Sequence, residues 1–99
     1  MAKVLIVDDH PLVARYTKAE VAALQPDADV EVAGTLAEAQ ALIADGTHPD
    51  YILFDLMLPD CDGLVGIVRL RQLAPKAVIG VISGETNPAV MRDCFLQGA

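Results

Sequence analysis

The amino-acid sequence predicts a doubly wound α/β fold, in which helices cover both faces of one parallel β-sheet. Short apolar runs rich in β-branched residues alternate with segments of helical character along the 99 residues. The runs are continuously apolar, which is typical of parallel strands buried on both faces. Such alternation implies right-handed crossover connections within a single domain. The expected strands are residues 4–7, 30–33, 52–54 and 78–82.

Residues that cap or stop helices separate four helical segments. Thr35 and Glu38 form a T-x-x-E capping box in front of a helix over residues 39–44, and Gly46 ends that helix. Proline fits the first turn of a helix and stops a helix that precedes it. The other expected helices are 12–24 (Pro11 in the first turn, Pro26 at the stop), 63–73 (capped by Asp62, stopped before Pro75) and 89–97 (capped by Asn87, started by Pro88, ended by Gly98).

Composition and charge exclude several classes of protein. The chain is 54% hydrophobic and 4% aromatic, which excludes intrinsic disorder and predicts an aliphatic core. The net charge of −7 argues against direct nucleic-acid binding, because phosphate binding needs clustered Lys and Arg. No apolar run approaches the roughly 20 residues of a membrane helix, and no signal peptide is evident, so we expect a cytoplasmic protein. Cys61 and Cys94 lack metal-binding spacing and are interpreted as reduced structural thiols.

Acidic residues follow two of the expected strands, at the end of an α/β sheet where ligands gather. Asp8 and Asp9 follow the first strand, and Asp55 follows the third. If these strands are neighbours, about 4.8 Å apart, the three carboxylates form one cluster. Two carboxylates ~4 Å apart repel by about 4 kcal/mol at an effective dielectric of about 20, so we expect a bound divalent cation. Oxygen ligands with open positions for water suit Mg²⁺ better than zinc or copper.

A simpler interpretation is that each aspartate only caps a helix or ends a strand. That alternative is a serious rival for Asp9, which directly precedes His10 and Pro11, and a weaker one for Asp55, where no helix starts. A carboxylate beside a metal suggests phosphoryl chemistry, because it can act as a nucleophile and form an acyl phosphate. Ser83, after the fourth strand, could then donate a hydrogen bond to the phosphoryl group. His10 is most simply a partly exposed loop residue, with proton transfer as the alternative.

The motifs VLIVDDHP, ILFDLMLPDCDG and VIGVISGE and the ending FLQGA carry a family resemblance. In order and spacing they resemble the receiver domain of bacterial two-component response regulators, over the whole length of the chain. The stretches DDHP and LRQLAP are most similar to receivers of the class often joined to a helix-turn-helix DNA-binding domain. The resemblance implies a flavodoxin-like sheet with strand order 2-1-3-4-5.

The resemblance also implies roles for individual residues. Asp55 would be the phosphoacceptor, taking a phosphoryl group from the phosphohistidine of a sensor histidine kinase. Asp9 and Asp55 would ligate Mg²⁺ directly, together with the backbone carbonyl of Met57, and Asp8 would act mainly through a bound water. Ser83 would be the switch hydroxyl that moves toward the phosphoryl group.

The chain departs from the family after Gly98 and Ala99, where receivers continue with a fifth strand, a Lys-Pro loop and a fifth helix. We therefore expect residues 1–99 to be a C-terminally truncated receiver domain of order 2-1-3-4. No other lysine is a plausible substitute for the missing one, which predicts impaired switching. The strand over 78–82 would become a sheet edge beside an uncovered apolar face, which predicts a homodimer or other self-association.

A second function therefore stays open. The chain would then be a receiver-like interaction or dimerisation fragment that is not competent for phosphotransfer. In either case we expect no enzyme, and at most self-phosphorylation and autodephosphorylation at Asp55.

Overall fold

The structure, a computed structural model, describes residues 2–55 and 63–82. Its elements alternate along the chain in the order β1 (Lys3–Val7), α1 (Pro11–Leu24), β2 (Asp29–Ala33), α2 (Leu36–Ala44), β3 (Tyr51–Asp55), α3 (Gly63–Leu73) and β4 (Val78–Ile82). The strands form one parallel sheet of order β2-β1-β3-β4. The predicted doubly wound α/β class and the order 2-1-3-4 are confirmed. The helix expected over 89–97 and the cap Asp62 lie outside the described residues.

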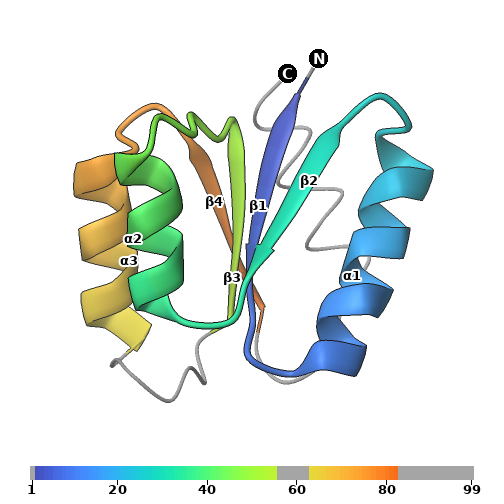
Figure 1. The fold of residues 1–99 in the computed structure, drawn as a ribbon, viewed down its shortest axis with the longest axis horizontal. Helices are drawn as coiled ribbons and strands as arrows, with labels where there is room; N and C mark the ends of the chain where they lie inside the picture. The colour runs from blue at the N-terminus through green and yellow to red at the C-terminus, as the bar shows by residue number, and fades with distance from the viewer. Residues whose placement is uncertain (1, 56–62, 83–99) are drawn as a thin grey trace.

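The sheet is the middle of three layers. In Figure 1, α2 and α3 cover one of its faces and α1 covers the other. Successive side chains of a strand point to opposite faces, so each strand feeds two cores, and its run is therefore continuously apolar. On the α1 face, the fully buried residues are Val4, Ile6, Leu53 and Val21. On the α2 and α3 face, the largest buried residues are Leu5, Val7, Ile52, Phe54, Leu36 and Leu70.

Helix α2 begins earlier than the expected 39–44 because its cap acts on the first turn. The Thr35 side chain accepts a hydrogen bond from the backbone N–H of Glu38 at 3.1 Å. The Glu38 carboxylate accepts in turn from the backbone N–H of Gly34 at 2.9 Å, one residue before the cap. The helix ends at Ala44, and Gly46 follows with φ of 101°, a left-handed conformation that favours glycine. The expected roles of Thr35 and Gly46 are confirmed.

Several large apolar side chains remain on the surface. Val65 and Val68 of α3 are exposed, and so are Leu12 and Tyr16 of α1. Within the described sheet, β2 and β4 are the edge strands. Among residues 2–55 and 63–82, no helix has both the length and the apolar character needed to span a membrane.

Candidate phosphoacceptor and metal site

The carboxyl ends of β1 and β3 bring the three predicted aspartates together. The parallel register pairs Val7 with Phe54, so Asp8 and Asp55 follow side by side. One oxygen from each of Asp8, Asp9 and Asp55 and one ring nitrogen of His10 all lie within 4.8 Å of one another. These four residues are called the acidic cluster below. It lies at the end of the sheet where β1 runs into α1, at the bottom of Figure 1.

Asp8 is buried, with 3% of its surface exposed. Its backbone N–H donates to the carbonyl of Ala33 at 2.9 Å, which extends the pairing of β1 with β2 by one residue. Its Oδ1 accepts from the backbone N–H of His10 at 2.9 Å. Burial raises the pKa of the Asp8 carboxyl, and the nearby charge of Asp55 raises it further, while the hydrogen bonds from His10 oppose the shift. Asp8 is therefore a carboxyl group for which ionisation in the folded chain is costly.

Asp9 does not cap α1. The residue at the N-cap is His10, and no side-chain hydrogen bond is made there. Oδ1 of Asp9 is inaccessible to solvent and accepts no hydrogen bond among the described residues. A buried carboxylate oxygen without a donor is costly unless a charge compensates for it. The capping alternative for Asp9 is therefore wrong, and the position of this oxygen favours a cation-binding role.

His10 lies among the carboxylates. Its Nδ1 is 3.2 Å from Oδ1 of Asp8, 3.1 Å from Oδ1 of Asp9 and 3.7 Å from Oδ2 of Asp55. The hydrogen bond with Asp8 and the charge of Asp9 raise the pKa of the His10 imidazole. The ring is about half exposed, as expected of a loop histidine, but its membership of the cluster was not predicted. The sequence signal for it is Pro11, because the residue before a proline is held in an extended conformation.

The donor set fits the expected divalent cation. Carboxylate oxygens are the protein ligands that Mg²⁺ prefers. The buried Oδ1 of Asp9 accepts no hydrogen bond among the described residues, and the group beside it is Nδ1 of His10 at 3.1 Å. Asp55, at the end of the neighbouring strand β3, supplies the third carboxylate and has 1% of its surface exposed. Met57 and Ser83 lie outside the described residues, so the carbonyl ligand and the switch hydroxyl stay predictions.

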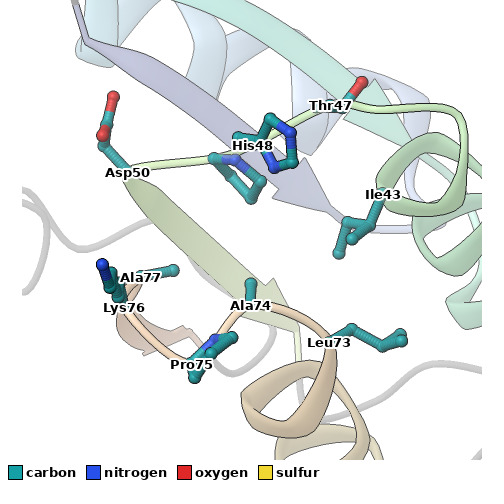
Figure 2. Close-up of a pocket in the computed structure, with 10 residues that line it drawn as sticks. Ile43, Thr47, His48, Asp50, Leu73, Ala74, Pro75, Lys76 and Ala77 are labelled. Carbon is teal, nitrogen blue, oxygen red and sulfur yellow. The ribbon is translucent and has the colours of Figure 1, made fainter.

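A cavity of about 340 Å³ lies at the opposite end of the sheet. Figure 2 shows its lining side chains, which come from Ile43 of α2 and from residues 47–50 before β3 and 73–77 before β4, with Lys76 among them. At this same end, the Nζ of Lys3 pairs with Asp29 at 2.7 Å and with Glu31 at 3.0 Å. Lys3 and Lys76 therefore lie at the amino ends of the strands, away from the acidic cluster.

Fold and cluster together define a parallel α/β domain with an acidic site at the carboxyl edge of its sheet. Residues 4–99 match the response regulator receiver domain family. The chain therefore belongs to this family.

Relatives and solved structures agree with this assignment. The chain is 32% identical over 99 residues to the glycerol metabolism activator of Pseudomonas putida, covering all of this chain and 45% of that protein. A CheY-like receiver domain protein of Methanospirillum hungatei JF-1 superposes with a TM-score of 0.75 at 26% identity, over 100% of this chain and 77% of that one. A response regulator of Burkholderia pseudomallei was solved with a phosphorylated aspartic acid, a calcium ion and citrate. It superposes with a TM-score of 0.70 at 26% identity, over 100% of this chain and 56% of that one. The chain thus spans less than half of its curated relative.

Proposed function

We propose that this chain is a phosphoacceptor, in which Asp55 accepts a phosphoryl group in a Mg²⁺-dependent reaction. The observation that carries the proposal is the convergence of Asp8, Asp9 and Asp55 within 4.8 Å at the carboxyl ends of β1 and β3. A phosphorylated aspartate and a divalent ion in the Burkholderia pseudomallei response regulator support the same chemistry. Receiver domains of response regulators interact with histidine kinases, so we take a kinase phosphohistidine as the donor.

In the proposed reaction, a carboxylate oxygen of Asp55 attacks the phosphorus of the donor phosphohistidine. The new P–O bond makes an aspartyl phosphate as the P–N bond breaks, and the electron pair leaves with the donor imidazole, which takes up a proton. Asp9, Asp55 and the carbonyl of Met57 would hold Mg²⁺ directly, with Asp8 acting mainly through a bound water, and Ser83 would donate a hydrogen bond to the phosphoryl group. The bound cation supplies positive charge that offsets the charge on the phosphoryl oxygens. Asp8, fixed by the His10 backbone N–H, keeps its carboxylate aimed at the cluster.

A small-molecule donor tests this function without the kinase. The chain is incubated with acetyl phosphate and Mg²⁺ and its intact mass is measured. We expect one added phosphoryl group, lost in Asp55→Asn and lost on chelation with EDTA. Asp27→Asn, an exposed turn position, is the control with the same change of charge and should be phosphorylated like the wild type. A folded wild-type chain that stays unmodified, or an Asp55→Asn chain that is modified equally, would overturn the proposal.

We also propose that switching within these 99 residues is impaired. The sequence has three lysines, of which Lys18 is an exposed residue of α1. Lys3 is engaged by Asp29 and Glu31, and Lys76 lines the opposite cavity. A phosphorylated or beryllofluoride-bound chain should therefore show NMR shifts confined to the neighbourhood of the acidic cluster, whereas shifts that extend over α3 and β4 would contradict impairment. The alternative of an interaction fragment without phosphotransfer is not favoured, because the carboxylates are assembled.

The partner predictions also remain proposals. We propose self-association through the β4 edge or an uncovered face, supported by the position of β4 at one edge of the sheet formed by the described residues and by the exposed Leu12 and Tyr16. A monomer by light scattering at tens of micromolar would contradict it. Direct nucleic-acid binding by this chain is not proposed, since its net charge is −7. The cytoplasmic location stays a prediction.

A further inference from the structure

We propose that His10 is a direct nitrogen ligand of the cation at the acidic cluster, and that the site therefore binds divalent transition ions such as Co²⁺, Ni²⁺ and Zn²⁺ more tightly than Mg²⁺. The inference rests on the cation site of the proposed function and goes beyond it by naming a fourth side-chain donor and a class of ion.

The positions of the donor atoms match those around a single ion. A cation ~2.1 Å from each ligand places neighbouring ligands about 3 Å apart and opposite ligands about 4 Å apart. Nδ1 of His10 lies 3.1 Å from Asp9 Oδ1, 3.2 Å from Asp8 Oδ1 and 3.7 Å from Asp55 Oδ2. One possible ligand atom from each of the four residues lies within 4.8 Å of the other three. One ion can therefore contact the ring nitrogen and the three carboxylates with movements of less than about 1 Å.

The backbone directs the ring into the cluster. Pro11 restricts the preceding residue to extended conformations, and His10 has φ of −95° and ψ of 106°. The backbone N–H of His10 donates to the same Asp8 oxygen that the ring nitrogen approaches, at 2.9 Å. The imidazole is thus positioned by its own main chain, by Asp8 and by Pro11. Because the ring is about half exposed, an incoming ion can reach it from solvent.

Nitrogen ligation changes which ions the site prefers. Imidazole suits zinc, nickel and cobalt, whereas carboxylates and water suit Mg²⁺. Magnesium also retains several waters and gains little from a nitrogen donor. A receiver site made only of carboxylates would therefore suit Mg²⁺. The imidazole of His10 shifts the preference of this site toward zinc, nickel and cobalt ions.

Metal titrations of single variants test the inference. Co²⁺ is followed by its visible absorption and Mg²⁺ by calorimetry, with wild type, His10→Ala, His10→Gln and His48→Ala. His48 is the matched control, because it is the second of the two histidines and lies in the cavity at the opposite end of the sheet. We expect both His10 variants to lose on the order of 10-fold to 100-fold in Co²⁺ affinity. Their Mg²⁺ affinity should stay within about threefold of wild type, and His48→Ala should bind both ions like wild type.

Each outcome decides the matter. A Co²⁺ affinity that is unchanged in both His10 variants overturns the inference, as does an equal loss for Co²⁺ and Mg²⁺, which would make His10 a positioning residue. Circular dichroism confirms that the variants fold. A wild type that binds Mg²⁺ and is phosphorylated, but shows no His10-dependent Co²⁺ binding, refutes only the inference. A wild type that binds neither ion refutes the cation site of the proposed function as well.

Discussion

Replacing Asp8 by Asn should stabilise the metal-free domain. Asp8 and Asp55 are 3% and 1% exposed, and their carboxylates belong to a cluster whose donor atoms lie within 4.8 Å of one another. The fold therefore holds two buried like charges together, an arrangement that suits cation binding and destabilises the chain when no cation is bound. Asn has the same shape and keeps the Oδ1 that accepts from the His10 backbone N–H. The substitution removes the charge and leaves that hydrogen bond.

The size of the effect follows from the geometry. One carboxylate oxygen of Asp8 and one of Asp55 lie no more than 4.8 Å apart, and two unit charges at that upper limit repel by about 3.5 kcal/mol at an effective dielectric of about 20. The variant also loses the charge-assisted contact with the His10 ring, and this loss destabilises the fold by about 1.5 kcal/mol. We expect a net gain of about 2 kcal/mol in the free energy of unfolding. For a domain of this size, that corresponds to a rise in Tm of roughly 8–16 °C.

The assay is thermal unfolding by circular dichroism in EDTA at neutral pH. Asp27→Asn, which removes an exposed acid, is the matched control and should change stability by less than about 0.5 kcal/mol. The folded chain raises the pKa of Asp8, so the wild type loses stability as pH rises from the unfolded pKa of about 4 through the folded value. The gap between wild type and Asp8→Asn should therefore close below about pH 4. An Asp8→Asn variant that is equal to or less stable than wild type at neutral pH would refute this reasoning.

Three further predictions concern metal linkage and helix ends. Mg²⁺ at 100 times its dissociation constant should stabilise the wild type by about 2.7 kcal/mol, and it should stabilise the Asp55→Asn variant much less. Equal shifts of Tm on addition of Mg²⁺ to the two proteins would contradict the cation site. Thr35→Ala should cost about 1 kcal/mol in denaturant unfolding, because the Glu38 N–H loses its cap; no loss would show that the cap is dispensable. Gly46→Ala should cost about 1 kcal/mol or more although no atom lies within 4 Å of the added Cβ, because φ is 101°. Gly34→Ala is its control, with only ordinary contacts to Glu38.

The fold was predictable because several local signals agree. The strands are marked by continuous apolar runs, and the ends of α2 are marked by the capping box at Thr35 and by Gly46. The structure has the strands and helices in the order that these signals predict. The boundaries that moved did so by one to three residues. Lys3 and Tyr51 extend their strands in the amino-terminal direction, because backbone pairing continues beyond the apolar run.

The candidate site was predictable in part. The convergence of Asp8 and Asp55 follows from parallel strands that are neighbours, and the register places them side by side. The capping alternative for Asp9 could not be decided from the sequence, because it depends on which residue takes the N-cap geometry, and that residue is His10. The position of the His10 ring could not be read either, since it depends on a hydrogen bond to Asp8 and on the backbone restriction by Pro11.

The most direct test of the central claim is to locate the phosphoryl group. The chain is treated with acetyl phosphate and Mg²⁺, the acyl phosphate is reduced with borohydride, and the modified residue is identified by tandem mass spectrometry. The account predicts a single modification, at Asp55, the residue that ends β3 beside Asp8. Modification at Asp8 or Asp9, or none in a folded chain that binds Mg²⁺, would contradict it.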